Sequence, residues 1–330
     1  MSPIPQTMRG VVVHEVGGPE VLEHRTDLPV PSPGEGQVLI KNSLAGVNFL
    51  DIYFRTGLYS SQMPFVPGQE GIGTVVAVGP GESSSKFKID DRVVYIGSGT
   101  YAEYSTAFVK YVAKVPDGID EKTVLVAFLS GLTTLSFVEE AYTIKPGDWA
   151  LLHAAAGGAG VLMTQLLKLS GARVIATAGG PDKCKLVKSL GADVVIDYRA
   201  ENWVARVMEA TNGQGVEVVY DSVAKDTWEG SLKVAKRKGT VVFFGNASGP
   251  VPPLSIEILR MKNLKLLRPT LYNYIATEEE FNHYTTKLFN LLATGQLKTF
   301  LQKVYPLEEI QQVHRDLEGR RTTGKILVKP

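Results

Sequence analysis

The sequence predicts an α/β protein of two domains: a β-barrel-like domain, followed by a domain built on a doubly wound parallel sheet. Three observations predict this class. The chain has 330 residues, a length that suggests about two domains. Its first third reads as short strands separated by Gly and Pro turns. Its middle reads as strands that alternate with helices, which is typical of parallel βαβ units.

The strand-rich part runs from Met8 to about Phe128. Turn clusters such as residues 31–34 and 79–81 separate short runs of β-favouring residues. Closely spaced strands of this kind predict a compact β-barrel-like domain. The expected strands include Arg9–His14, Gln37–Ser43, Gly73–Val78, Arg92–Tyr95 and Tyr101–Thr106.

The alternating part runs from Phe128 to about Pro269, and its crossovers are expected to be right-handed. The expected strands are Ala150–His153, Arg173–Thr177, Val194–Asp197, Val216–Asp221, Thr240–Gly245 and Leu264–Leu267. Expected helices between them include Val161–Ser170, Asp182–Leu190 and Ala200–Ala210.

The last part of the chain contains two helical patterns and a strand. Thr277–Thr294 has apolar residues at helical spacing, Leu307–Gly319 predicts a second helix, and Gly324–Val328 predicts a strand. The expected domain bounds are therefore 1–128, 129–269 and a C-terminal segment 270–330.

Composition limits the class of partner. The formal net charge is +1, which gives no indication of a nucleic-acid or membrane surface. The single cysteine, Cys184, can form neither an intrachain disulfide nor a Cys-rich zinc site. No signal-peptide pattern and no run of about 20 apolar residues are visible. We expect a cytoplasmic protein that does not enter a membrane.

The stretch Gly147–Lys168 organises the second domain. An apolar run, Trp149–Leu152, is followed by small residues and then by helical spacing, which reads as strand, turn and helix. The turn contains Ala155-x-Gly157-x-x-Gly160, a variant of the dinucleotide fingerprint with Ala in the first Gly position. Gly157 would let the backbone approach a pyrophosphate, and Gly160 would let the helix lie against the strand. An ordinary Gly/Ala-rich turn is the alternative. The predicted cofactor loop comprises Ala155, Ala156, Gly157, Gly158, Ala159 and Gly160.

This stretch resembles the signature of the quinone oxidoreductase/zeta-crystallin family, within the medium-chain dehydrogenase/reductase superfamily. The matching residues are Gly147, Asp148, Leu151, Ala155, Ala156, Gly157, Gly158, Gly160, Gln165 and Lys168. Further segments that match are Gly17–Leu22, Val47–Tyr59, Pro67–Gly79 and Asp91–Tyr95. The resemblance implies a GroES-like β-barrel catalytic domain, a Rossmann cofactor domain, a C-terminal segment that returns to the catalytic domain, and a homodimer.

The second strand of the alternating part indicates the cofactor. An NAD site carries an acid at the end of this strand, which binds the ribose 2′-hydroxyl. Here the strand ends in Ala178, Gly179 and Gly180, and Asp182 comes later, where it could cap the next helix. Lys183 follows at the helix start, and the resemblance adds Tyr198 as a phosphate neighbour. Both could instead be solvated surface residues. We predict NADPH.

Two further segments are assigned to the cofactor by resemblance. Thr133 matches a threonine near the nicotinamide, and Phe244, Gly245 and Asn246 match a loop beside the nicotinamide ribose. Arg268 lies where the chain leaves the cofactor domain, and an ordinary ion pair is its alternative role.

The residues argue against a zinc site. Zinc-using alcohol dehydrogenases of the superfamily carry a catalytic Cys and a Gly-His-Glu segment; by resemblance, the Cys place reads Asn48 and the His place reads Gln69, before Glu70. The histidines have no i, i+4 pair, and each is expected to be a surface or hydrogen-bonded residue. They are His14, His24, His153, His283 and His314. We predict no metal.

Chemistry without a Lewis acid suits an acceptor that takes hydride readily, such as a quinone or enone. The candidate catalytic residues lie in one segment: Asn48, Asp51, Tyr53 and Tyr59. Asn48 and Tyr53 can donate hydrogen bonds to the oxygen that gains charge, and Asp51 can orient these groups or a ribose. The alternatives are that the tyrosines are packing residues and that Asp51 caps a helix beginning near Ile52.

The predicted function is therefore reduction of quinones by NADPH without zinc. An NADPH-dependent alkenal or enone double-bond reductase is the enzymatic alternative. Zeta-crystallin relatives bind AU-rich RNA and some serve as lens proteins, so the resemblance also allows RNA as a secondary partner. The sequence shows no basic stripe or aromatic RNA motif.

Overall fold

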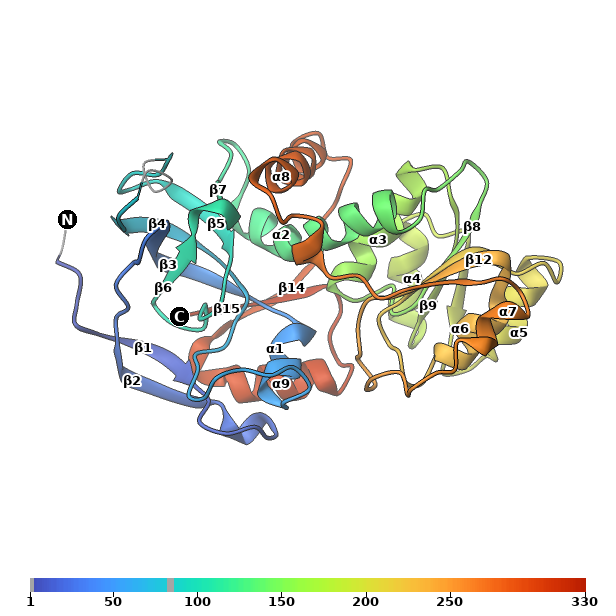
Figure 1. The fold of residues 1–330 in the computed structure, drawn as a ribbon, viewed down its shortest axis with the longest axis horizontal. Helices are drawn as coiled ribbons and strands as arrows, with labels where there is room; N and C mark the ends of the chain where they lie inside the picture. Colours follow the sequence, from blue (N-terminus) through green and yellow to red (C-terminus); the bar gives the residue numbers. More distant parts are fainter. Residues whose placement is uncertain (1–2, 82–85) are drawn as a thin grey trace. The chain divides into compact units, whose positions relative to one another are not determined.

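The computed structural model describes residues 3–81 and 86–330 and divides into two compact units (Figure 1). Unit 1 comprises Met1–Leu129, Thr277–Gln296 and Phe300–Pro330, and unit 2 comprises Ser130–Ala276 and Leu297–Thr299. Residues 270–276 and Leu297–Thr299 thus belong to unit 2, although they were expected in the C-terminal segment that returns to the catalytic domain.

Unit 1 is built on a mostly antiparallel sheet. Within the described residues its strand order is β14-β15-β3-β4-β5-β7, with β6 paired to β3, and β1 and β2 form a separate antiparallel pair. The long central strand, β3, buries Val38, Leu39 and Ile40. The strands are β1 (Thr7–Val12), β2 (Glu23–Pro29), β3 (Gln37–Val47), β4 (Glu70–Val78), β5 (Arg92–Ile96), β6 (Tyr104–Phe108), β7 (Val112–Lys114), β14 (Leu301–Pro306) and β15 (Lys325–Lys329).

Strand ends differ from the sequence prediction where loops take the hydrogen bonds. The expected strand Tyr101–Thr106 begins only at Tyr104. Tyr101 lies in a loop, where its N–H donates to the carbonyl of Pro67 and its carbonyl accepts from Val11. β4 begins earlier than expected, at Glu70, because Glu70 pairs with Ile96.

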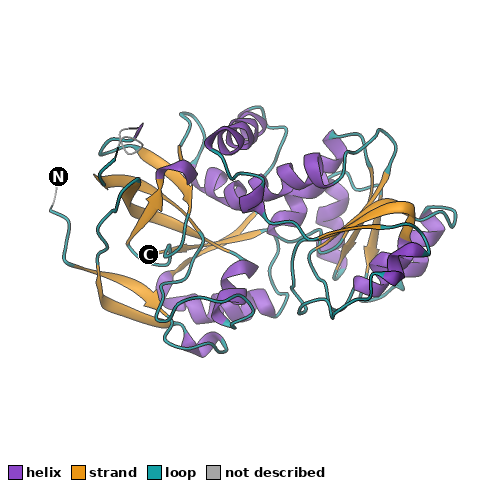
Figure 2. Cartoon of the chain, viewed as in Figure 1, coloured by secondary structure: helices purple, strands orange, loops and turns teal. Residues whose placement is uncertain are grey.

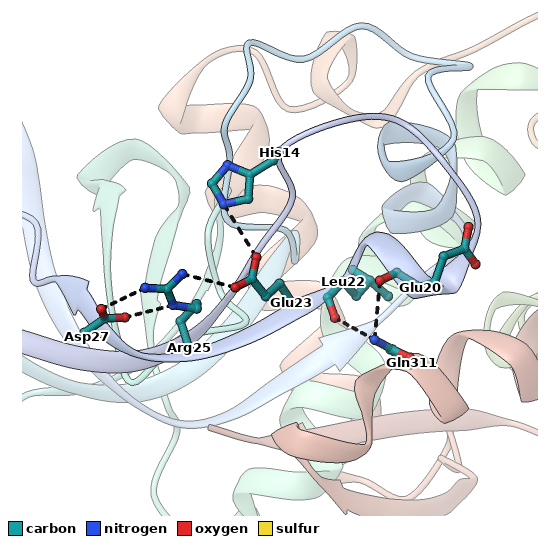
Figure 3. A network of polar contacts seen from close by, with 7 residues as sticks. All are labelled: His14, Glu20, Leu22, Glu23, Arg25, Asp27 and Gln311. Carbon is teal, nitrogen blue, oxygen red and sulfur yellow. Dashed lines mark hydrogen bonds and ion pairs between the residues drawn. The ribbon is translucent and has the colours of Figure 1, made fainter.

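The C-terminal segment supplies parts of unit 1. β15 pairs antiparallel with β3, so the last strand lies beside an early one. The helices of unit 1 are α1 (Phe49–Arg55), most of α2 (Glu121–Ser136), α8 (Glu278–Ala293) and α9 (Ile310–Glu318). Gln311 of α9 donates to the carbonyl oxygen of Leu22 at 3.1 Å. Figure 3 shows this contact beside an exposed chain of polar contacts formed by His14, Glu23, Arg25 and Asp27.

Unit 2 is a doubly wound sheet with helices on its faces (Figure 2). Its six strands run parallel in the order β10-β9-β8-β11-β12-β13. Numbered within the unit this is 3-2-1-4-5-6, the order of the dinucleotide-binding Rossmann fold. The strands are β8 (Trp149–Leu152), β9 (Arg173–Ala178), β10 (Val194–Asp197), β11 (Val216–Asp221), β12 (Ala235–Phe243) and β13 (Lys265–Leu267). The helices between them are α3 (Gly158–Leu169), α4 (Pro181–Ser189), α5 (Trp203–Ala210), α6 (Trp228–Val234) and α7 (Glu257–Arg260).

One helical stretch in the described residues, Glu121–Ala141, is long and apolar enough to span a membrane, with 21 residues and a mean hydropathy of 1.5. The sequence predicted no membrane span, because it shows no uninterrupted run of about 20 apolar residues. Of its most apolar window, 72% is buried inside the protein, as in a core helix of a globular protein.

Candidate active site

The predicted fingerprint forms the turn between β8 and α3. Ala154 adopts a left-handed conformation with φ 53°, and the N–H of Ala155 donates to the carbonyl of Thr177 at 3.0 Å. Gly157 is the N-cap of α3, and the first intrahelical bond runs from Val161 to Gly157. The N–H groups of the first turn have no intrahelical acceptor, and the helix dipole adds positive charge there. The loop fits a pyrophosphate.

Gly160 is required by close packing of helix against strand. A Cβ at this position would lie 2.4 Å from the carbonyl oxygen of Ala154 and 2.7 Å from Cα of Ala155. Both obstacles are backbone atoms, which cannot move aside without opening the turn. The role that the fingerprint assigned to Gly160 therefore has a direct geometric basis.

A buried polar network lies next to the loop. His153, just past β8 and 2% exposed, contacts Thr177 Oγ1 through Nδ1 at 3.0 Å and Ser231 Oγ through Nε2 at 3.3 Å. Burial lowers the pKa of His153, although Asp221 opposes this. The Asp221 carboxylate accepts from Ser231 at 2.7 Å and from Thr227. His153 is thus a hydrogen-bonded core histidine, and the network joins the ends of β8, β9 and β11.

The predicted 2′-phosphate site lies between β9 and α4. Gly180 has φ 94° and is the N-cap of α4, so Asp182 lies in the first turn and is not the cap. A Cβ on Gly179 would meet the Tyr198 hydroxyl at 2.7 Å and Arg199 Nε at 2.9 Å. Both side chains therefore lie directly against Gly179. Lys183 follows in the first turn of α4.

Sequence reasoning missed Arg199 and the role of Asp197. Arg199 directly follows Tyr198, so a search for a second cation near the strand end could have found it. Asp197 ends β10, and its Oδ1 accepts from the N–H groups of Gly180 and Arg199, each at 3.0 Å. These two backbone hydrogen bonds lower the pKa of Asp197 below its usual value, and the one from Gly180 has the larger effect. Asp197 therefore fixes the loop on which the cations stand.

The remaining cofactor candidates lie mainly at the end of β12. The N–H of Phe244 donates to the carbonyl of Asp221 at 2.8 Å, and a Cβ on Gly245 would be 2.6 Å from the carbonyl oxygen of Ser222. Arg268 Nη1 donates to the carbonyl of Phe243 at 3.1 Å, and with the amide oriented accordingly Asn246 accepts from Arg268 Nη2 at 3.1 Å.

The sheet order brings these segments to one edge. Loops after β8, β9, β11 and β12 all leave the carboxyl ends of parallel neighbouring strands. Ligands of this fold bind outside those ends, at the point where the strand order reverses. Here that point lies between β8 and β11. Thr133 is separate in the secondary structure, since it lies near the C-terminal end of α2.

In unit 1, the candidate catalytic residues lie on α1 or next to it: Asp51 and Tyr53 on the helix, Asn48 at its N-cap, and Tyr59 just past its end. Asn48 is the N-cap, and its backbone N–H donates to Asp51 Oδ2 at 2.7 Å, so Asp51 does cap the helix, which begins at Phe49. The Tyr101 hydroxyl also donates to Asp51 Oδ2, at 2.7 Å. The other carboxyl oxygen, Oδ1, is buried and has no partner. Burial raises the pKa of Asp51 to about 7, although the hydrogen bonds from Tyr101 and Asn48 lower it.

A buried ion pair lies beside Asn48. Lys325 of β15 and Glu70 of β4 are 3% and 0% exposed, and Lys325 Nζ is 2.5 Å from Glu70 Oε1. Lys325 also donates to Asn48 Oδ1 at 2.5 Å, and Asn48 Nδ2 donates to Glu70 Oε1 at 2.9 Å. Sequence reasoning missed this pair, because Lys325 is 255 positions from Glu70 and no local pattern links them.

The tyrosines and the anchor of α1 complete this region. Tyr53 is buried, with its ring centroid 5.3 Å from that of Tyr59 in an edge-on arrangement. Arg55, 1% exposed, donates to Glu318 Oε1 at 2.6 Å and to His314 Nδ1 at 3.0 Å. Burial lowers the pKa of His314 to about 3, and the Arg55 charge adds to this effect, so the ring is neutral and accepts. These contacts fix α1 to α9.

The donor set does not favour a metal. Among residues 3–81 and 86–330, no group of three or more His, Cys, Asp or Glu side chains lies together as a metal site requires. Asn48 and Gln69 offer amide oxygens, and Glu70 already pairs with an ammonium group. A second cation at Glu70 would meet that charge.

Comparison with known families agrees with both units. The family described as alcohol dehydrogenase GroES-like domain matches residues 34–117, and the family described as zinc-binding dehydrogenase matches residues 158–290. The two matches together cover more than half of the chain.

Curated relatives match over nearly the full length. Quinone oxidoreductase 1 of Escherichia coli (strain K12) is 40% identical over 323 residues, 96% of this chain and 98% of the relative. A probable quinone oxidoreductase of Schizosaccharomyces pombe is 39% identical over 319 residues, 96% of each chain. A 2-haloacrylate reductase of a Burkholderia species is 35% identical over 329 residues, 97% of this chain and 98% of the relative.

Solved structures give the same answer. Escherichia coli quinone oxidoreductase complexed with NADPH has a TM-score of 0.93 and 38% identity, covering 98% of this chain and all of that one. A mycobacterial protein complexed with NADPH has a TM-score of 0.94 and 42% identity at the same coverage. The chain therefore belongs to the quinone oxidoreductase family of the medium-chain dehydrogenases/reductases.

Proposed function

We propose that this protein is an NADPH-dependent quinone reductase that works without zinc. One observation carries the cofactor choice: Gly179 lies against the Tyr198 hydroxyl and the Arg199 guanidinium, with Lys183 in the next turn. A 2′-phosphate would meet cations and a hydroxyl at this strand end, where an NAD site carries an acid. The relatives named quinone oxidoreductase, and the NADPH complexes among similar structures, support the same function.

The residues divide the work between the units. NADPH would supply the hydride when bound, and the backbone N–H groups at the start of α3 in unit 2 would hold its pyrophosphate. In unit 1, Asn48 and Tyr53 are the proposed donors to the acceptor oxygen that gains negative charge, because both carry polar hydrogens on α1 or its cap. Asp51 holds the start of α1 through the backbone of Asn48.

A substrate panel tests this function. NADPH consumption is recorded with ortho-quinones, para-quinones and alkenals, and NADH is compared in each case. We expect the highest turnover with a quinone and a preference for NADPH. No turnover with any quinone would contradict the proposal.

An alkenal or enone double-bond reductase is the second candidate. The similarity to 2-haloacrylate reductase favours it, since that relative's name describes reduction of a conjugated acid. It would use the same cofactor loop with a different acceptor preference, and the panel separates the two outcomes.

A homodimer is proposed as the assembly. β13 is the edge strand of the unit 2 sheet, with Leu266 exposed on it. Nearby in the chain, Ile256 and Met261 are 80% and 79% exposed. An open edge with apolar side chains can continue a sheet across a two-fold axis. Light scattering at micromolar concentration should give twice the chain mass of 35.8 kDa.

Two further proposals concern cellular location and RNA binding. We also propose a cytoplasmic location, because the single cysteine, Cys184, cannot form the intrachain disulfides that are common in secreted proteins. RNA binding rests on family resemblance, and the net charge of +1 gives it no electrostatic support. Competition between NADPH and an AU-rich RNA in a binding assay would test an RNA mode at the cofactor site.

A further inference from the structure

The buried ammonium of Lys325 stands between two polar side chains of unit 1. Its Nζ lies 2.5 Å from Glu70 Oε1 and 2.5 Å from Asn48 Oδ1. Glu70 is also held from another side, because its Oε2 accepts from the backbone N–H of Leu129 at 3.0 Å. Lys325 and Glu70 are fully buried, and Asn48 is only half-buried. Asn48 is therefore the member of this group that can reach a ligand.

The two charges leave the Asn48 amide one orientation. An ammonium group only donates hydrogen bonds, and a carboxylate only accepts them. Asn48 therefore turns its oxygen to Lys325 and its NH₂ group to Glu70, as the contacts at 2.5 Å and 2.9 Å show. A rotation by half a turn would place NH₂ against ammonium and oxygen against carboxylate, which loses both hydrogen bonds and adds two repulsions.

This orientation leaves one N–H of Asn48 loosely held. One hydrogen of Nδ2 serves Glu70, and the remaining contact of Nδ2 is with the carbonyl oxygen of Gly46 at 3.4 Å, a long hydrogen bond. Exchanging that weak contact for a substrate oxygen costs little.

We propose that Lys325 is a positioning residue for substrate reduction: through its ammonium group it fixes the Asn48 amide so that this N–H is presented as a donor to the acceptor oxygen. The proposal rests on the proposed reductase function and on Asn48 as a donor within it. Lys325 acts through Asn48 and touches neither cofactor nor acceptor in this account. The Lys325 ammonium group thus places a positive charge beside Asn48 and Glu70, in the segments where the zinc-using members of the superfamily carry metal ligands.

The first test removes the ammonium group and returns it as a solute. Lys325→Ala should lower kcat with a quinone about ten- to a hundredfold and leave the Kd for NADPH within about twofold. This loss is smaller than removal of an oxyanion donor itself causes, because the Asn48 N–H stays in place and only its fixed orientation is lost. Methylammonium should restore both kcat and Tm of this variant. Tetramethylammonium and sodium chloride at matched ionic strength should restore neither, because they donate no hydrogen bond to Asn48 or Glu70.

The second test asks whether the effect passes through Asn48. In an Asn48→Ala background, Lys325→Ala should cost less than about twofold further in kcat, because a shared interaction is already lost. Lys329→Ala is the matched control, since Lys329 lies exposed at the end of the same strand and should change nothing.

Stability is separated from positioning by removing both charges. Glu70→Gln/Lys325→Met leaves no unpaired buried charge, so folding should be retained even if Lys325→Ala folds poorly. Its kcat should stay low, because nothing then selects one orientation of Asn48.

Three outcomes would overturn the inference: full kcat in either Lys325 variant, equal losses with and without Asn48, or methylammonium restoring Tm but not kcat. Failure of wild-type protein to reduce any quinone or conjugated carbonyl would instead count against the proposed function.

Discussion

The cofactor loop of unit 2 and the Asn48 group of unit 1 are built on opposite principles. The loop is contiguous in sequence, from Ala154 to Gly160, and its contacts are made by backbone atoms. The Asn48 group draws side chains from four separate segments: Asn48 with Asp51, then Glu70, Tyr101 and Lys325. The cofactor loop depends on close steric packing of backbone atoms, whereas the Asn48 group depends on the charge and protonation of its side chains.

The difference determines how each region fails. At Gly160 even a methyl group would collide with the backbone of Ala154 and Ala155, so a small side chain there is enough to disturb the loop. In the Asn48 group the shape tolerates substitution better than the charges do, since an unpaired buried charge is costly. Five predictions test this contrast, in order of decreasing expected effect.

Gly160→Val should cause the greatest loss. Its Cβ would lie 2.4 Å from the Ala154 carbonyl oxygen, so the turn must open or α3 must shift. We expect NADPH affinity to fall about a hundredfold or more and stability to fall by about 1–3 kcal/mol. NADPH titration and thermal unfolding measure both. Gly97→Ala is the control, because its Cβ would meet ordinary contacts of 3.5 Å and beyond. Unchanged NADPH binding in Gly160→Val would break the comparison.

Asp51→Asn should change how stability depends on pH. Burial raises the pKa of Asp51 to about 7 from 3.8, so the folded protein holds a proton that the unfolded chain releases. Its contribution to the free energy of unfolding therefore falls as pH rises from about 4 to 7, by up to about 4 kcal/mol. An amide does not titrate, so the Asn variant lacks this pH-dependent contribution to the free energy of unfolding. Urea unfolding should therefore show that the stability of the variant relative to wild type is higher at pH 8 than at pH 5. A difference in stability that does not change with pH would contradict a raised pKa at Asp51.

Lys183→Ala and Arg199→Ala should separate the two cofactors. Each removes a cation near Gly179, and a charge-assisted contact is worth about 1.5–3 kcal/mol, so NADPH affinity should fall about ten- to a hundredfold. NADH affinity should hardly change, because it lacks the 2′-phosphate. Lys185→Ala, an exposed lysine on the same helix, is the control. Equal losses for both cofactors would mean that neither cation reads the phosphate.

Tyr53→Phe should have a smaller effect, about tenfold in kcat/KM for a quinone. The ring packs edge-on against Tyr59, and Phe keeps that contact while removing one donor. Initial rates with quinone at saturating NADPH measure the loss. Tyr111→Phe, outside the candidate site, controls for general effects of a lost hydroxyl. Full activity of Tyr53→Phe toward every quinone would leave Tyr53 as a packing residue.

Chelation should have no effect. Asn48 and Gln69 stand where zinc ligands would, and Glu70 is already paired with Lys325. Prolonged dialysis against a chelator should leave turnover unchanged. Recovery of activity that depends on added zinc would show that the amide donors hold a metal after all.

Local sequence determined the parts of the protein that depend on neighbouring residues. The strands Val194–Asp197 and Val216–Asp221 appear with the bounds that the apolar runs predicted, and the fingerprint predicted the turn at Gly157 and the contact at Gly160. Helix starts were predicted less accurately. The helix expected over Ala200–Ala210 begins at Trp203, because the Asn202 side chain caps it. Strand Leu264–Leu267 is one residue shorter than expected.

Tertiary structure alone decided the contacts between distant segments. Arg199 could have been noticed beside Tyr198, but the pairing of Lys325 with Glu70 follows only when β15 lies against β3 and β3 against β4. The burial that raises the pKa of Asp51 also depends on tertiary packing, which brings the hydroxyl of the loop residue Tyr101 to Asp51 Oδ2, although that hydrogen bond itself lowers the pKa. The conformation of a strand, turn or helix end depends mainly on a few neighbouring residues, so it can be predicted from the sequence. The energy of a buried charge depends on every segment that excludes water from it, and no local pattern contains that information.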